Sequence, residues 1–166
     1  MDHVDRVLAQ WRRERPGISV APMGTIGRIT RLRQHLMRAM EKTFAEHGLN
    51  RASFDVLATL RRSGPPYALS PGDLMASTMV TSGTMTYRID QLEEAGMIKR
   101  VKNPEDGRGF LISLSQQGYD LIDKAVTAHV ETQARLVTSL TAGQRKQLDE
   151  LLRQFLSGFE EEPNNT

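Results

Sequence analysis

Residues 70–114 read SPGDLMASTMVTSGTMTYRIDQLEEAGMIKRVKNPEDGRGFLISL and carry the densest set of structural signals in the chain. The opening SPGD is typical of a helix start, because a serine N-cap, an early proline and a first-turn carboxylate all suit that position. We expect a short helix over 71–76 and then a tight turn. A second helix, capped by Thr81 or Ser82, should run to Ala95 and end at the glycine that follows.

Two short strands are expected next, over 97–102 and 110–114. They flank the link NPEDGRG, whose Asp-Gly pair favours a hairpin turn. A helix, a tight turn, a second helix and a hairpin together make a winged helix-turn-helix, which we place at residues 50–114. An α-helix fits the major groove of DNA, and its N-terminal turn can face the base edges. The order of elements therefore favours a partner that is double-stranded DNA.

The second helix of this unit sorts into two faces at 100° per residue. Met85, Ile89 and Leu92 share one side and should be buried. The opposite side and the first turn carry small hydroxyl residues and longer polar ones, which can donate to bases and phosphates. The candidate DNA contacts from this helix are Thr81, Ser82, Thr84, Tyr87 and Gln91. For Thr81 and Ser82, simple helix capping is an equally good interpretation.

Arg108 lies at the expected tip of the hairpin. An arginine there can enter a narrow minor groove, where the negative potential is enhanced. An ordinary solvated turn charge is the alternative, and the preceding helix-turn-helix favours the groove. We therefore add Arg108 to the candidate DNA contacts.

The segments outside this lobe read as amphipathic helices. These helices are expected over 4–11, 24–47, 116–138 and 144–159, and one more is expected inside the lobe, over 51–62. The apolar stripes of the terminal segments 4–11 and 144–159 present more surface than one small lobe can cover. We therefore expect a mainly α fold with a small β-hairpin wing. Residues 1–48 and 116–159 should form the helices of a homodimer.

Composition excludes several classes of function. The chain has 166 residues, no cysteine, and a net charge of +2. Its four histidines do not cluster, and it holds no nucleophile, Walker or dinucleotide-binding motif, so we expect no enzyme, metal or cofactor. No apolar run is long enough for a membrane span or a signal peptide, which predicts a cytoplasmic protein.

The pattern resembles the MarR family of bacterial regulators over residues 24–158. The carrying motifs are FDVLATL at 54–60, VTSGTMT at 80–86, RIDQLE at 88–93, GMI at 96–98, DGR at 106–108 and SLSQQG at 113–118. The resemblance implies a homodimer that binds a palindromic operator. It also implies repression of a nearby gene that a small ligand relieves.

The extra N-terminal helix is similar to that of the urate-responsive branch of this family. In that branch a tryptophan, an aspartate and two arginines form the ligand site. The corresponding residues here are Trp11, Asp55, Arg88 and Arg100. Urate or a related purine is the ligand that this resemblance implies, since a planar anion suits an indole ring and arginine donors.

The residues by themselves leave plainer interpretations open. Trp11 could be a core residue, Asp55 a solvated first-turn carboxylate, and Arg100 a surface charge. Arg88 lies only about 60° from Met85 on the wheel, so its charge turns inward and needs a partner. Two alternatives for the whole chain also remain: a regulator that responds to a phenolic acid, and a winged-helix module that binds protein.

Overall fold

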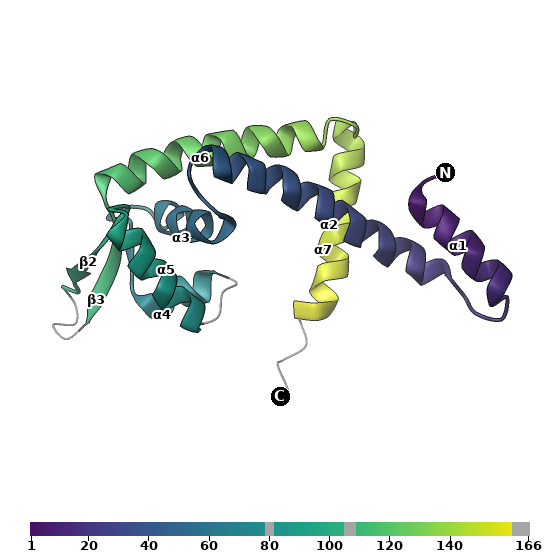
Figure 1. The fold of residues 1–166 in the computed structure, drawn as a ribbon, viewed down its shortest axis with the longest axis horizontal. Coiled ribbons are helices and arrows are strands. Elements are labelled where there is room, and N and C mark those ends of the chain that lie inside the picture. Colours follow the sequence, from purple (N-terminus) through teal and green to yellow (C-terminus); the bar gives the residue numbers. More distant parts are fainter. Residues whose placement is uncertain (79–81, 105–108, 161–166) are drawn as a thin grey trace. The chain divides into compact units, whose positions relative to one another are not determined.

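The structure is a computed structural model that describes residues 1–78, 82–104 and 109–160, with only the backbone described at 82–84. It divides into two compact units, residues 1–129 and 130–166. The elements of the described ranges are α1 (His3–Glu14), α2 (Ala21–Glu46), α3 (Arg51–Arg62), β1 (Ala68–Leu69), α4 (Pro71–Ser77), α5 (Ser82–Glu94), β2 (Ile98–Lys102), β3 (Phe110–Leu114), α6 (Gln116–Leu136) and α7 (Ala142–Glu160) (Figure 1). The mainly helical fold with a small antiparallel sheet is confirmed.

The predicted helix boundaries hold to within a few residues, and one difference has a clear cause. We expected this helix to begin at residue 24, after Pro22, whereas α2 begins at Ala21. Proline is tolerated in the first helical turn, because the N–H that it lacks would have no partner inside the helix. Pro22 therefore lies inside the first turn of α2.

Side-chain caps set the ends of several helices. Asn50, Ser70 and Ser115 each accept a hydrogen bond from the backbone N–H three residues further on, at 2.9, 3.1 and 2.9 Å. Gly48 and Gly96 follow α2 and α5 with φ values of +69° and +73°, a conformation that favours glycine. The predicted cap at Ser70 and the predicted stop at Gly96 are confirmed.

The sheet has three strands in the order β1-β3-β2, all antiparallel. β2 and β3 form the expected hairpin, with Ile98 opposite Leu114 and Lys102 opposite Phe110. Strand β1 was not predicted, because two residues are too few to show an alternating pattern. It pairs with the end of β3 and joins the wing to the segment before α4.

One hydrophobic core holds the winged helix-turn-helix lobe together. Met85, Ile89 and Leu92 of α5 are buried in it, as the helical wheel predicted. Their buried neighbours come from α2, α3, α4, both wing strands and α6: Phe44, Phe54, Val56, Leu57, Leu60, Leu74, Ile98, Ile112, Leu114, Ile122 and Ala125. Because one face of α5 is fixed in this core, its opposite face is held outward.

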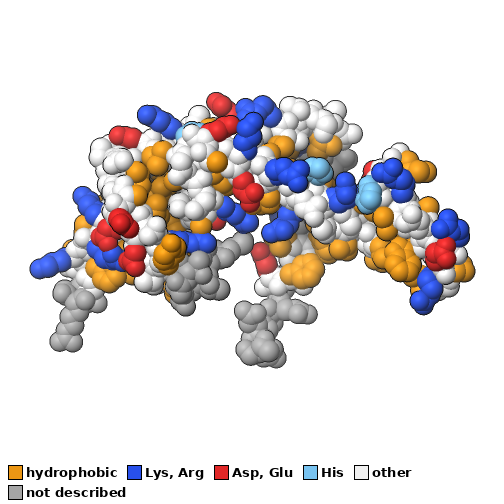
Figure 2. Space-filling model, in the orientation of Figure 1, with side chains coloured by type: hydrophobic (Ala, Val, Ile, Leu, Met, Phe, Trp, Pro, Cys, Tyr) orange, Lys and Arg blue, Asp and Glu red, His pale blue; other side chains and the backbone are white. Residues whose placement is uncertain are grey.

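The terminal helices leave apolar surface uncovered. In the first unit α1 packs on α2 through Val4 and Leu8, but Ile26 and Leu32 of α2 remain more than half exposed. Figure 2 shows apolar side chains at the surface over α1 and along α2. In the second unit α7 has no buried residue, and its exposed apolar side chains are Leu148, Leu151, Leu152, Phe155, Leu156 and Phe159.

Gly118 in the first turn of α6 provides a test of the packing. A Cβ atom at this position would overlap the carbonyl oxygen of Met97, which belongs to the backbone and cannot turn away. We expect Gly118→Ala to lower the free energy of unfolding by about 1–3 kcal/mol, as overpacking of a tight contact does. Urea unfolding followed by circular dichroism measures the change.

Gly143→Ala in α7 is the matched control, because nothing lies within 4 Å of a Cβ atom built there. Alanine is the better helix former, so this variant should be as stable as the wild type or up to about 1 kcal/mol more stable. Equal midpoints for the two variants would contradict the close approach of α6 to Met97.

Candidate functional site

The outward face of α5 carries two of the predicted DNA contacts. Tyr87 is 65% exposed and Gln91 is also exposed, while Arg88 between them is half-buried. Ser82 and Thr84 lie on the backbone of α5, but their side chains are outside the described residues. Thr81 and the wing residue Arg108 lie outside the described ranges altogether.

Strand β2 places further cations beside α5. Lys99 and Lys102 are exposed to solvent on the wing. The exposed polar face of α5 and the cations of the wing thus belong to one lobe, which is the arrangement that contact with adjacent grooves of DNA requires. None of the described helices is long and apolar enough to cross a membrane.

Arg100, the third cation of β2, is bonded to α5. Its Nη2 donates to Asp90 Oδ1 at 2.5 Å, and its Nη1 donates to Glu93 Oε2. Its backbone N–H donates to the other oxygen of Glu93 at 3.2 Å. The guanidinium also lies 5.6 Å from the ring centroid of Phe110 on β3. The three hydrogen bonds tie the wing to α5, and the contact with Phe110 joins the two wing strands.

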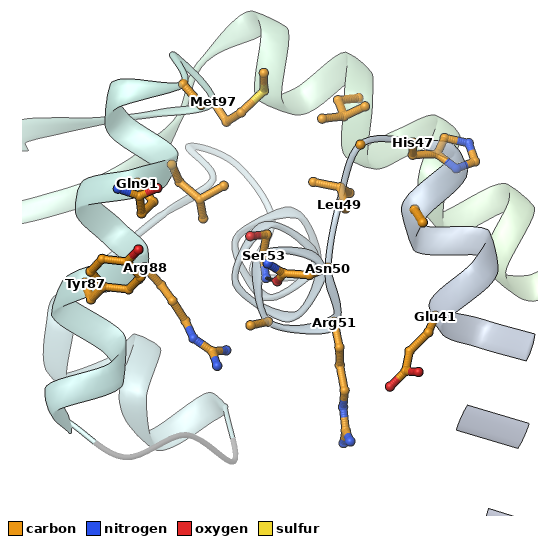
Figure 3. Close-up of a pocket in the computed structure, with 16 residues that line it drawn as sticks. Glu41, His47, Leu49, Asn50, Arg51, Ser53, Tyr87, Arg88, Gln91 and Met97 are labelled. Carbon is orange, nitrogen blue, oxygen red and sulfur yellow. Dashed lines mark hydrogen bonds between the residues drawn. The ribbon is translucent and has the colours of Figure 1, made fainter. Parts of the chain in front are cut away.

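A cavity of about 970 Å³ opens between the C-terminal end of α2, the start of α3 and α5. The charged and polar side chains along its wall include Glu41, His47, Asn50, Arg51, Tyr87, Arg88 and Gln91 (Figure 3). Figure 3 shows Arg51 and Arg88 extending toward the same side of α3, from two different elements. The cavity therefore presents two arginine side chains to any ligand that enters it.

Asp55 lies beside this cavity without lining it. Its Oδ2 is 3.8 Å from Nε of Arg51, one helical turn earlier on α3. Partial burial raises the pKa of the Asp55 carboxyl, and the nearby charges of Arg51, Arg88 and Arg62 oppose that effect. Asp55 is thus within electrostatic reach of Arg88. Among the described residues, Asp55 forms its ion pair with Arg51.

Trp11 is far from the cavity within one chain. Helix α1 runs antiparallel to α2, with Leu8 against Gly24 and Val4 against Gly27. Trp11 follows Leu8 and is 40% exposed, beyond this contact. The cavity begins at Glu41 of α2, seventeen residues after Gly24, or about 25 Å along the helix. Of the four implied ligand residues, Arg88 lines the cavity, Asp55 lies within electrostatic reach of Arg88 beside it, and Trp11 and Arg100 lie elsewhere.

Two residues near the cavity were missed at the level of sequence. Arg51 lines it, and the spacing of Arg51 and Asp55, four apart on a helix, was a signal that could have been used. His129 of α6 packs against the rings of Phe44 and Phe54, at 5.2 and 4.9 Å between centroids. Burial lowers the pKa of His129, and the charge of Asp55 opposes that effect. No sequence pattern pointed to His129.

The raised pKa of Asp55 predicts a stability cost at neutral pH. Because the folded state binds the proton more tightly than the unfolded state, the ionised carboxylate disfavours folding. We expect Asp55→Asn to unfold at a higher temperature than the wild type at pH 7. The difference should narrow as the pH falls toward about 4, near the ordinary pKa of an aspartate. Thermal melts across this pH range measure it.

Asp149→Asn is the control for this prediction, because Asp149 is well exposed and pairs with Arg153 four residues away, as Asp55 does with Arg51. It should change the melting temperature little at any pH. A lower melting temperature for Asp55→Asn at pH 7 would show that the surrounding arginines outweigh the cost of burial.

Comparison with known proteins gives the family. A sequence model described as the MarR family matches residues 47–109. The chain is 38% identical to the HTH-type transcriptional regulator PecS of Dickeya dadantii (strain 3937), over 90% of each chain. That relative is a transcriptional regulator, in agreement with the expectation that the chain is not an enzyme.

Solved structures of MarR proteins also match this chain. A MarR variant from E. coli, crystallised with operator DNA, matches with a TM-score of 0.70 and 25% identity over 82% of this chain and 95% of that one. AbsC, a MarR family regulator from Streptomyces coelicolor, matches in fold with a TM-score of 0.77 and 19% identity over 87% and 98% of the two chains. From the extent and identity of these matches, the chain belongs to the MarR family of winged helix-turn-helix transcriptional regulators.

Proposed function

We propose that this chain is a repressor that binds a palindromic operator as a homodimer and is released from it by a small anionic aromatic ligand. The observation that carries the proposal is the position of Arg88. This residue lies on the helix whose outer face would read DNA, and it also lines the cavity of about 970 Å³. Tyr87 and Gln91 of the same helix also line this cavity, and Arg88 is the one of these three that carries a charge, so an anion in the cavity would act on α5 through Arg88.

The proposed DNA contacts combine α5 and the wing. Helix α5 would enter the major groove with Tyr87 and Gln91, together with the hydroxyl residues Thr81, Ser82 and Thr84 of its first turn. Arg108 would enter the flanking minor groove. The exposure of Tyr87 and Gln91 and the burial of the opposite face of α5 support this arrangement.

The proposed dimer accounts for the uncovered apolar faces. Residues 1–48 and 116–159 would interlock with the same segments of a second copy, and the lobe at 50–114 would remain free for DNA. Exposed leucines and phenylalanines along α7 support the proposal, because contiguous apolar surface of this kind is typical of an interface. Two-fold symmetry would match a palindromic operator.

The proposed ligand is a planar anion that competes with Asp55 for Arg88. A ligand held by Arg51 and Arg88 would neutralise charge that now acts on Asp55, and it would shift α5 because Arg88 belongs to that helix. Differential affinity for the two positions of α5 would drive release from DNA. Urate or a related purine is the ligand that we favour. A phenolic acid is the alternative, since it also offers a ring and a negative charge.

We further propose that Trp11 reaches this site from the partner subunit. Within one chain Trp11 lies at the far end of α2 from the cavity, so it can contact the same ligand as Arg88 only from another copy. Its exposed ring and the exposed Ile18, Met23 and Ile26 nearby support an interface at this end of α2. Arg100 is already bonded to α5, and we assign it a different role below.

DNA binding should be specific and strongly dependent on salt. If the dimer contacts six to ten phosphates, its affinity should fall by about 10³–10⁵-fold between 50 and 200 mM salt. Gln91→Ala should cost about 1–3 kcal/mol on the preferred duplex, and Arg108→Ala should weaken binding most at A/T-rich flanks. Fluorescence anisotropy with half-sites about 10 base pairs apart measures both.

Gln10→Ala on the exposed surface of α1 is the control for Gln91→Ala and should bind DNA as the wild type does. Wild-type affinity of Arg108→Ala would reject the wing contact. A chain that sediments as a monomer at micromolar concentration would reject the dimer and the palindrome with it.

Ligand binding should be visible through Trp11, which is the only tryptophan. Urate should quench its fluorescence and release the DNA. Arg88→Ala should abolish both responses and also weaken DNA binding, whereas Arg153→Ala, on the face of α7 opposite its exposed apolar row, should abolish neither. If urate has no effect while salicylate quenches and releases, the purine is wrong and the phenolic acid takes its place.

A mixed dimer tests whether Trp11 acts across subunits. One chain carries Trp11→Phe and the other carries Arg88→Ala, with different affinity tags for purification. If the site is shared, the remaining tryptophan faces the intact Arg88, and urate quenches its fluorescence. If each site belongs to one chain, the remaining tryptophan faces an alanine, and the fluorescence does not change.

A further inference from the structure

We infer that Arg100 is a positioning residue that fixes the wing to the DNA-reading helix, so that α5 and the hairpin meet DNA as one rigid body. The inference rests on the DNA reading proposed above for α5. Arg100 is the middle residue of β2. It contacts two carboxylates of α5 and one ring of β3, so a single side chain joins three elements of the lobe.

The geometry of the two carboxylates is specific for a guanidinium group. Asp90 and Glu93 are three apart on α5 and therefore lie on the same side of the helix. One terminal nitrogen of Arg100 donates to Asp90 and the other donates to Glu93. Two donors at a fixed separation constrain both distance and orientation, which a single lysine charge would not do.

Glu93 also bonds to the main chain of the wing. Its Oε1 accepts from the backbone N–H of Arg100, while its Oε2 accepts from the side chain. The Glu93 carboxylate therefore binds both the backbone N–H and the side chain of Arg100. A hydrogen bond to the backbone fixes the strand itself, so the restraint acts on the position of the wing and not only on the rotamer of Arg100.

Phe110 covers the remaining face of the guanidinium group. The ring centroid lies 5.6 Å from the Cζ of Arg100, and Phe110 begins β3 directly opposite Lys102 at the end of β2. The exposed fraction of the side chain is 32% for Arg100, 36% for Glu93 and 56% for Asp90, so the pair with Glu93 is the better shielded from water. Shielding of this kind strengthens an ion pair relative to a fully exposed one.

The charges around Arg100 argue against a direct role in binding an anion. One guanidinium charge faces two carboxylates, so the cluster as a whole is negative. A phosphate or a ligand anion would have to displace both Asp90 and Glu93 to reach Arg100. Lys102, two residues further on the same face of β2, is exposed and has no ion pair among the described residues, so it is the better candidate for a phosphate contact.

The test compares Arg100→Gln with Lys102→Gln on a duplex that the wild-type protein selects from random-sequence DNA. Arg100→Gln should lower affinity about tenfold, in the range of coupling within an ion-pair network, and leave the slope of log affinity against log salt unchanged. Lys102→Gln should reduce that slope by about one, as loss of a phosphate contact does. A reduced slope for Arg100→Gln would overturn the inference.

Glu93→Gln removes the charge of the carboxylate that pairs with Arg100. It should weaken DNA binding less than Arg100→Gln does, because the pair between Arg100 and Asp90 remains. The double variant should be no weaker than Arg100→Gln alone, because Arg100→Gln already removes the ion pair with Glu93. Additive losses would overturn the inference. If Arg100→Gln does not fold, Glu93→Gln and Asp90→Asn carry the same comparison.

The distance between β2 and α5 shows whether Arg100 positions the wing or only contributes to the stability of the fold. This measurement does not require DNA. The chain has no cysteine, so Lys99→Cys on β2 and Glu94→Cys on α5 take spin labels at two defined exposed sites. The distance distribution should be narrow in the otherwise wild-type protein and broad in Arg100→Gln. Equal distributions would reject the restraint even if the variant bound DNA weakly. Failure of the wild type to select any duplex would instead reject the proposed function.

Urate titration gives the last comparison. Arg100→Gln should show the same Trp11 quenching as the wild type, because its side chain does not line the cavity. Loss of quenching with unchanged DNA affinity would make Arg100 a ligand contact and overturn the positioning role.

Discussion

The burial of one side of α5 is the constraint on which the rest of the lobe depends. Met85, Ile89 and Leu92 are anchored in a core that includes α3, α6 and both wing strands. Because a helix cannot rotate about its axis without exposing such a row, this packing determines which side chains face outward. Tyr87 and Gln91 are thereby presented to solvent, and Arg88 is held at the margin between core and surface.

Two arginines at the edges of α5 have contrasting environments. Arg88 leaves the helix toward a cavity with Arg51 on its wall, and the carboxylate within its electrostatic reach is Asp55. Arg100 approaches the helix from the wing and is fully engaged by Asp90 and Glu93. The first arrangement leaves charge available to a ligand. In the second arrangement the charge of Arg100 is paired with two carboxylates that join the wing to α5. Arg100 is therefore better suited to linking these elements than to binding a ligand.

Much of the fold was accessible from sequence because its signals are local. Caps such as Asn50 and Ser70, and stops such as Gly48 and Gly96, act within one helical turn of the residues that they control. The start of α2 was misplaced since a proline can open a helix as well as end a linker. Strand β1 was missed because it exists only through its pairing with β3.

The sequence by itself determined the order of helices, the hairpin, the buried row of α5 and the family resemblance, since each depends on residue types at short spacing. The tertiary structure decided which candidate residues meet. Four residue types matched a ligand site, yet only Arg88 lines the cavity, with Asp55 in electrostatic reach of it. A helix of 26 residues separates the Trp11 of the same chain from the cavity, and Arg100 is bonded to α5. Spacing along the chain carries no information on the partner that a long side chain such as Arg100 finds, so its bonds to α5 appeared only in the folded protein.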